Sequence, residues 1–160
     1  MRQRVSRLGF PVKTMMRNDL KSNDARRAAN APHLKISLEY VDKILDHLVK
    51  HDISMYRLSS DLAPYATHPE MPQFHGMIAD SKAELAAIGK KAQALDIRLS
   101  FHPSQYVVLN SPDPTLVAKS VWDLLSQAEM LDLMDLGHEA VLVIHWAALT
   151  VTSVRAASGG

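Results

Sequence analysis

The chain has 160 residues, of which 47% are hydrophobic and 22% are charged, and these proportions fit one globular domain with a proper core. It contains no cysteine, which excludes disulfides and thiolate metal sites, and no apolar run long enough to form a membrane-spanning helix. The first residues lack the apolar core of a signal peptide, so we expect a soluble, cytoplasmic protein.

The formal net charge of +1 is unevenly distributed along the chain. Residues 1–35 carry nine lysines and arginines against two aspartates, a net charge of +7, whereas the remaining residues have a net charge of −6. A basic segment on an otherwise acidic domain is typical of polyanion binding. The alternative interpretation is a solvated polar loop.

In chain order, short apolar runs alternate with longer helical patterns. Residues 5–10 predict a first strand, and a polar loop follows to about His33. The next helix has one apolar face, formed by Leu38, Val41, Leu45 and Leu48. Residues 54–60 predict a second strand, and residues 62–76 predict a loop.

A second helix is expected from Ser81, because Glu84 three residues later would complete a capping box. Its expected buried face is Leu85, Ile88, Ala92 and Leu95. Residues 97–102 predict the third strand.

The last predicted helix begins with Asp113 as the N-cap and Pro114 at the first helical position. It is expected to end near Gly137, a residue type common after helices. Its expected apolar positions are Leu116, Val121, Leu124, Leu125 and Leu131. Residues 140–145 predict a fourth strand, and alternating strands and helices predict a parallel sheet with right-handed crossovers.

A weak repeat, Arg-Leu-small residue, begins at Arg7, Arg57 and Arg98 in the first three strands. In each strand the arginine and the small residue would lie on the side opposite the leucine. A polar side suits a strand that lines a barrel, so the predicted architecture is a (β/α)₈ TIM barrel. Such a barrel typically needs about 250 residues, so this α/β chain predicts a partial barrel of about four parallel strands. The arginines have no evident partner in the sequence.

Three histidines follow the predicted strands, where a barrel has its active site: His68, His102 and His145. They are either hydrogen-bonded structural residues or ligands of a metal ion such as manganese or zinc. Only Asp61 and Glu70 lie near the predicted strand ends as carboxylate ligands. A site of three histidines could hold zinc with one open position, or carboxylates from absent strands could complete it. The other five histidines are expected at the surface.

Gln105 and Tyr106 stand together on the loop after the third strand. A tyrosine ring can stack on a nucleobase, and a glutamine amide both donates and accepts hydrogen bonds. The alternative is that Tyr106 packs beneath its loop.

Several segments, taken in order, resemble the UV damage endonuclease family from about Arg4 to Trp146. They are residues 7–11 (RLGFP), 64–69 (PYATHP), 102–107 (HPSQYV) with 111–114 (SPDP), and 141–145 (VLVIH). The match covers about nine-tenths of this chain but only the first half of a family member. The resemblance therefore assigns residues 1–146 to the N-terminal half of a TIM-barrel endonuclease domain, and residues 147–160 to a divergent tail rich in small residues.

The resemblance implies a DNA-repair enzyme that uses divalent metal ions, manganese in particular or zinc, to cut the strand 5′ of UV photoproducts. By motif, His68, His102 and His145 would be metal ligands, and Gln105 and Tyr106 would wedge into the duplex. Phe10 stands where the family has a tyrosine that contacts DNA, and Ser104 replaces an expected glycine. The basic stretch over residues 13–27, with Lys13 and Arg17, would lie along the phosphates.

The expected partners are damaged double-stranded DNA and either a second copy of the chain or a complementing C-terminal half, without a membrane. The chain alone is expected to be weakly active or inactive, because it lacks the later carboxylate ligands. Two other functions stay open: a metal-dependent sugar isomerase or epimerase on the same barrel, and a non-catalytic fragment that binds DNA or metal.

Overall fold

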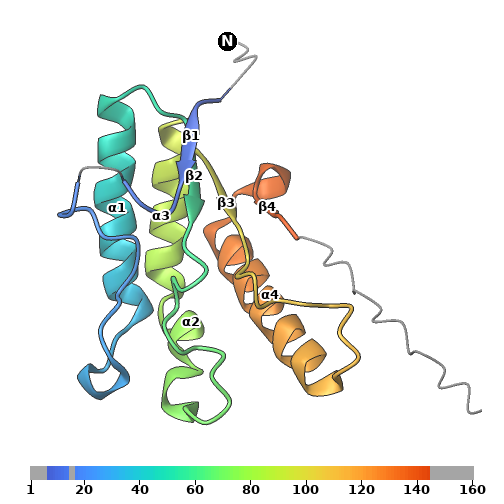
Figure 1. Ribbon diagram of the computed structural model, residues 1–160. Helices are drawn as coiled ribbons and strands as arrows, with labels where there is room; N and C mark the ends of the chain where they lie inside the picture. Colours follow the sequence, from blue (N-terminus) through green and yellow to red (C-terminus); the bar gives the residue numbers. More distant parts are fainter. Residues whose placement is uncertain (1–6, 15–16, 145–160) are drawn as a thin grey trace, which may run out of the picture.

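The computed structural model describes residues 7–14 and 17–144, which form a sheet of four parallel strands in the order β1-β2-β3-β4. The strands are β1 (Gly9–Pro11), β2 (Met55–Leu58), β3 (Arg98–Phe101) and β4 (Val141–Leu142). Each strand pairs with the next strand along the chain, and the helices between them run alongside the sheet (Figure 1). The predicted alternation of parallel strands and crossover helices is confirmed.

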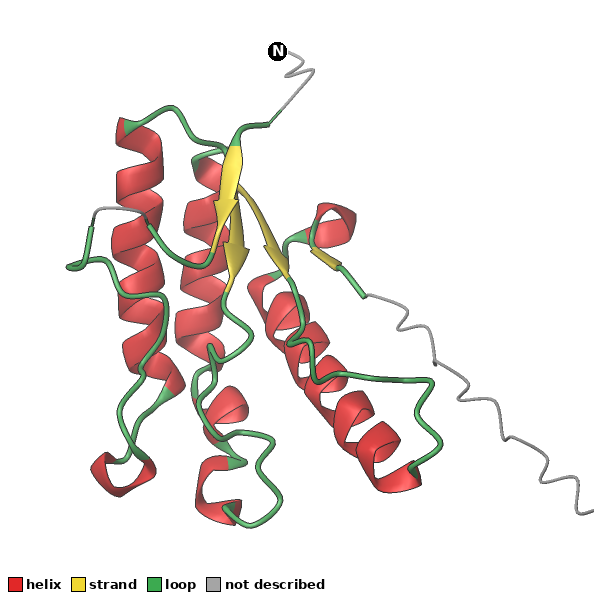
Figure 2. Cartoon of the chain, viewed as in Figure 1, coloured by secondary structure: helices red, strands yellow, loops and turns green. Residues whose placement is uncertain are grey.

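Three long helices connect the strands: α1 (Leu34–Lys50), α3 (Lys82–Ala94) and α4 (Pro114–Met134). Shorter helical segments are η1 (Ala28–Asn30), η2 (Pro72–Phe74), α2 (Met77–Asp80) and η3 (Gly137–Glu139). Helix α3 packs between α1 and α4. Figure 2 shows the long loops leaving the arrowheads of β2 and β3, which is the edge where parallel barrels have their active sites. Among the described residues, no helix is long and apolar enough to cross a membrane.

The core lies between the sheet and the helices and follows the predicted apolar faces. The four predicted positions of α1 are all buried, and so are Leu85, Ile88 and Ala92 of α3, whereas Leu95 is half-buried. From the sheet, Tyr56, Leu58, Leu99 and Phe101 enter the same cluster. Leu58 and Leu99 of the repeat therefore face the helices, as predicted, whereas Leu8, which precedes β1, is 68% exposed.

The start of α3 differs from the predicted capping box. Because α2 immediately precedes α3, Ser81 lies at the junction of the two helices, and its hydroxyl donates to the carbonyl of Met77 at 2.7 Å. Glu84 pairs instead with Lys35, at 2.9 Å. The capping-box prediction is therefore wrong, although the helix it was meant to start is present.

Helix α4 begins as predicted, since the side chain of Asp113 accepts a hydrogen bond from the Thr115 N–H at 2.9 Å. It ends at Met134 with Asp135 in the left-handed conformation, earlier than the predicted stop near Gly137. Of its expected apolar positions, Leu131 is buried and Leu116 and Leu124 are half-buried, whereas Val121 and Leu125 are exposed. The buried residues of α4 are Ser120, Gln127, Met130, Leu131 and Met134.

The close passage of α3 over α4 explains this rotation of the buried face. A Cβ atom on Gly89 of α3 would lie 1.8 Å from the carbonyl oxygen of Met134. The two backbones therefore touch at a glycine, and this contact fixes how the C-terminal end of α4 is rotated. Hydrophobic periodicity cannot report such a backbone contact.

Two of the three repeat arginines, Arg7 and Arg98, do have partners, contrary to the sequence-based interpretation. Arg7, just before β1, donates to the carbonyl oxygen of Asp96 at 2.7 Å and to its carboxylate at 2.9 Å, and it also reaches Glu139 at 3.4 Å. Arg98 donates to the carbonyl of Glu139 at 2.8 Å. These bonds tie the start of β1 to residues that precede β3 and β4.

Candidate functional site

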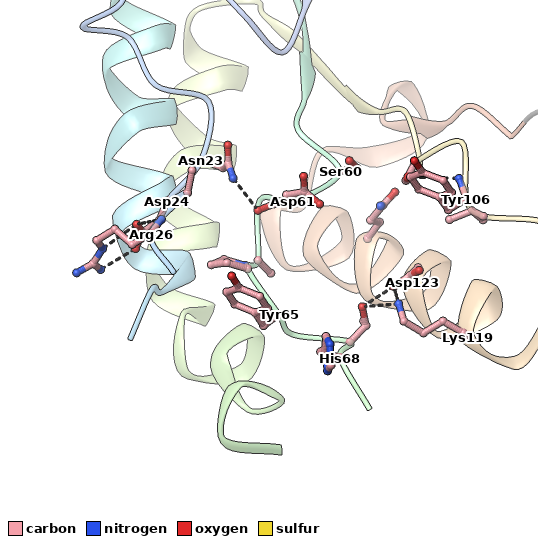
Figure 3. Close-up of a pocket in the computed structure, with 17 residues that line it drawn as sticks. Asn23, Asp24, Arg26, Ser60, Asp61, Tyr65, His68, Tyr106, Lys119 and Asp123 are labelled. Carbon is pink, nitrogen blue, oxygen red and sulfur yellow. Dashed lines mark hydrogen bonds and ion pairs between the residues drawn. The ribbon is translucent and has the colours of Figure 1, made fainter. Parts of the chain in front are cut away.

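A cavity of about 500 Å³ opens at the carboxyl ends of the strands. The loops after β2 and β3, helix α4 and the N-terminal basic segment all contribute to its wall (Figure 3). Lining residues from these four sources include Asp24, Ser60, His68, Tyr106, Lys119 and Asp123. The cavity thus lies where a barrel enzyme has its active site.

His68 lies in the wall of this cavity, on the loop after β2. Its N–H donates to the carbonyl of Tyr65 at 3.0 Å, and its ring Nδ1 accepts the N–H of Glu70 at 3.3 Å. In that tautomer the proton of a neutral imidazole sits on Nε2. Binding of a cation through Nε2 would therefore require the contact with Glu70 to change.

His102 follows β3 and lines a second, smaller cavity of about 230 Å³. Ser104 and Val107 line both cavities, so the two hollows are neighbours. Ring Nδ1 of His102 lies 3.0 Å from the carbonyl of Pro103. Donation from Nδ1–H to that carbonyl leaves the lone pair on Nε2, which is the tautomer that metal-binding imidazoles use. His145 lies outside the described residues.

The described residues alone do not form a metal site, since no three of their histidine, aspartate and glutamate side chains gather around one point. Asp61 and Glu70, the two carboxylates predicted near the strand ends, are exposed. Within the described part of the chain, no carboxylates therefore gather with the imidazoles of His68 and His102 into one metal centre.

Gln105 and Tyr106 are both exposed on the loop after β3. The Tyr106 side chain is 75% exposed at the rim of the large cavity (Figure 3), so the alternative in which it packs beneath the loop is wrong. The loop is held from below, because the Val108 N–H donates to the buried hydroxyl of Ser120 on α4 at 2.9 Å.

The other predicted DNA contacts lie apart from the cavity wall. Phe10 is half-buried and packs edge-on against Tyr56, with ring centroids 5.5 Å apart. Lys13 is exposed. Arg17 lines a separate hollow beside α1 and forms a two-pronged ion pair with Asp19, whose pKa its hydrogen bonds lower to about 2. A phosphate at Arg17 would compete with this carboxylate.

Nothing in the sequence predicted a role for Asp24, yet its carboxylate is buried within the basic segment. Its carboxylate accepts two hydrogen bonds from the Arg26 guanidinium, at 2.7 and 2.8 Å, and one from the His33 N–H at 2.9 Å. The Arg26 hydrogen bond, assisted by the backbone N–H groups, holds the pKa of Asp24 below its usual value, against the opposing effect of burial. Asp24 thereby fixes the end of the basic segment beside the cavity.

Sequence reasoning also missed the polar residues that α4 presents to the cavity. Lys119, Asp123 and Gln127 follow each other at intervals of four residues, so they share one face of the helix. Lys119 donates to Asp123 at 2.6 Å, and the buried Oε1 atom of Gln127 has no hydrogen-bond partner among the residues that the structure describes. An i, i+4 ion pair in a sequence is usually a solvated pair, and only the helix packing shows that this one borders a cavity.

His75, expected at the surface, is half-buried. Its ring Nε2 lies 2.7 Å from the carbonyl oxygen of His68, and its ring meets Trp122 of α4 edge-on, with centroids 4.8 Å apart. His75 therefore links the loop that carries His68 to helix α4.

The sequence of this chain is similar to those of known endonucleases. A sequence model described as UV-endonuclease UvdE matches residues 7–150. The chain is 31% identical to the UV DNA damage endonuclease of Bacillus velezensis over 137 residues, which are 84% of this chain and 42% of the relative. Its identity to the corresponding protein of Bacillus pumilus is also 31%, over 82% of this chain and 41% of the relative. The chain thus spans less than half the length of these relatives.

The fold is also similar to the crystal structure of SacUVDE, with a TM-score of 0.76 and 28% sequence identity. The similarity covers 89% of this chain and 50% of the other. The four parallel strands of this chain correspond to a partial TIM barrel.

Proposed function

The chain belongs to the UV-endonuclease UvdE family, and from this membership we propose that it serves as the N-terminal half of an endonuclease that cuts DNA 5′ of UV photoproducts. The observation that carries the proposal is Tyr106, whose ring stands 75% exposed at the rim of a cavity at the strand ends. An exposed aromatic ring beside a cavity suits stacking on a base at a distorted step, where unstacking costs less than in intact DNA.

In this proposal Gln105 and Tyr106 enter the damaged duplex, and Phe10 and Lys13 contact the DNA beside them. Arg17 binds a phosphate when it leaves Asp19. Because each phosphate contact displaces counterions, binding should weaken as the salt concentration rises.

His68, His102 and His145 would supply imidazole ligands to divalent metal ions, manganese in particular or zinc. The tautomer of His102 supports this role, and carboxylates from outside the described residues would have to complete the set. When bound, such ions lower the pKa of a water molecule and stabilise a departing oxygen. Without the carboxylates, the chain alone should cut weakly or not at all.

The proposed partners are damaged double-stranded DNA and a complementing C-terminal half, with a second copy of the chain as the alternative. Support comes from the length of the relatives, of which this chain spans about two-fifths, and from exposed apolar residues on α4.

The test is nicking of supercoiled plasmid with manganese present. The plasmid is either UV-irradiated or untreated, and the chain is assayed alone and with the C-terminal half of the Bacillus velezensis relative. We expect nicks in irradiated plasmid when both halves are present, and loss of nicking with a chelator. Equal nicking of untreated plasmid, or none with both halves present, would contradict the proposal.

Binding to an irradiated duplex separates recognition from cutting. Tyr106→Ala should weaken binding by about five- to 150-fold, since stacking of one base contributes about 1–3 kcal/mol. Tyr106→Phe keeps the ring and should bind like the original chain. Fluorescence anisotropy measures both variants, and equal affinities for Tyr106→Ala and Tyr106→Phe would remove Tyr106 from the recognition surface.

A further inference from the structure

Helix α4 is joined to the loop after β2 by a triangle of Thr67, Lys119 and Asp123. The Thr67 hydroxyl donates to the Asp123 carboxylate, and the Lys119 ammonium donates to the same carboxylate oxygen at 2.6 Å and to the Thr67 hydroxyl at 3.2 Å. Figure 3 shows Lys119 and Asp123 side by side, joined by dashed lines, at the cavity wall near His68.

The triangle is partly withdrawn from solvent, since the side chains of Lys119 and Asp123 are 34% and 24% exposed. Partial burial strengthens the hydrogen bonds of a charged group relative to those of a solvated surface pair. A simple i, i+4 surface pair would not need the third member, which comes from a loop 52 residues away in sequence from Lys119.

His68 is held from both of its sides by contacts to α4. On one side is Thr67, the neighbouring residue, within the triangle. On the other, the carbonyl of His68 lies 2.7 Å from His75 Nε2, and His75 packs against Trp122. Both contacts end on adjacent residues of α4, Trp122 and Asp123, so the helix sets where the His68 backbone lies.

We propose that Lys119 and Asp123 are positioning residues that hold His68 at the cavity through the hydroxyl of Thr67. The contacts among Thr67, Lys119 and Asp123 form a clamp between the loop and α4. The importance of His68 rests on the function proposed above, whereas the clamp itself does not. The loop after β2 is also held within itself, since the His68 N–H donates to the Tyr65 carbonyl at 3.0 Å and the Met71 N–H donates to the His68 carbonyl at 3.1 Å. These bonds shape the loop, whereas the bonds of Thr67 join it to α4.

The test compares two variants of Thr67 in the full chain. Thr67→Val keeps the shape but removes the hydroxyl, while Thr67→Ser keeps the hydroxyl. We expect Thr67→Val to speed amide hydrogen exchange in residues 66–71 about tenfold and to shift the ring ¹H–¹⁵N resonances of His68, because it removes hydrogen bonds to two charged groups. Exchange in α1 should stay unchanged, and Thr67→Ser should restore the behaviour of the original chain.

A second pair of variants tests the helix side of the clamp. Asp123→Asn should produce the same local changes as Thr67→Val, whereas Asp132→Asn, at an exposed aspartate of the same helix, should produce none. The proposal is overturned if Thr67→Val and Asp123→Asn leave the loop and the His68 resonances unchanged, or if exchange accelerates equally throughout the chain. If these changes occur but the two halves together do not nick irradiated DNA, the clamp stands and the proposed function fails.

Discussion

Asp24 shows how much one buried carboxylate organises in this fold. The basic segment would be expected to repel itself, yet its end is held to α1 by a single anion that binds Arg26 and the N–H of His33. The N–H of Asp24 itself donates to the buried Ser37 hydroxyl at 2.8 Å. The basic segment is therefore fixed in position where it approaches the cavity.

The lowered pKa of Asp24 predicts a dependence of stability on pH. Because the folded pKa lies below the ordinary value of about 3.9, the stabilisation is fully present above that value and is lost as the pH falls through the folded pKa. Asp24→Asn should lower the free energy of unfolding at pH 7 by about 1–3 kcal/mol. It should also flatten the decline of stability as the pH falls below about 4.

Urea unfolding at a series of pH values measures both effects. Asp61→Asn, at an exposed aspartate near the same cavity, is the control and should change neither. An unchanged pH profile in Asp24→Asn would show that other carboxylates cause the acid sensitivity.

Residues of the candidate site could be predicted from the sequence where they belong to a recognisable motif. The sequence placed His68 and Tyr106 on the loops that now line one cavity. It could not place Lys119 and Asp123 there, because a lysine and an aspartate four residues apart look like any solvated helix pair. Their role depends on which side of α4 meets the loop after β2, and that is a property of tertiary packing.

At the scale of elements, α1 and α4 show why prediction succeeded in one helix and failed in the other. Helix α1 packs through large side chains, so its leucines report its buried face. Helix α4 approaches α3 at Gly89, where backbone meets backbone, and its buried positions include Ser120 and Gln127 beside Met130, Leu131 and Met134. The positions of the strands followed from apolar runs, but the contact between two helices did not.

The backbone contact at Gly89 predicts that a larger residue there will lower the stability of the protein. Gly89→Ala would place a Cβ 1.8 Å from the backbone oxygen of Met134, and backbone cannot rotate away as a side chain can. We expect a loss of about 1–3 kcal/mol in the free energy of unfolding. Gly76→Ala is the matched control, since its Cβ would meet nothing closer than 3.8 Å, and it should change stability by less than about 0.5 kcal/mol.

Chemical denaturation of the two variants under the same conditions measures the difference. Similar stabilities for Gly89→Ala and Gly76→Ala would mean that α3 and α4 can separate without cost, and that the close passage does not fix the rotation of α4.

At the scale of the whole molecule, the described sheet has two edges, β1 and β4, and α4 has an exposed apolar side. Val121 and Leu125, one turn apart on α4, are 41% and 63% exposed. Single exposed apolar residues are common, but a pair on one helix face beside an edge strand fits a surface that another part of a barrel covers. The length of the relatives points to a complementing half as its occupant.

Leu125→Lys should therefore weaken association with the C-terminal half of the Bacillus velezensis relative by about tenfold or more, since burial of a leucine contributes about 1.5–3 kcal/mol. Val49→Lys, at an exposed valine on α1, is the control and should associate normally. Sedimentation velocity measures the complex. Association of the chain with itself alone, lost in Leu125→Lys, would favour a second copy as the occupant.

The bonds of Arg7 have a consequence for how the chain folds during synthesis. Each strand pairs only with the strand made just before or after it, so one strand-and-helix unit after another can dock as the ribosome delivers it. Arg7 departs from this order, because its partners are made much later. They are Asp96 and then Glu139, which lies 132 residues after Arg7. Arg7 therefore binds Asp96 once the residues before β3 have been made, and it gains its last partner, Glu139, only when the residues before β4 follow.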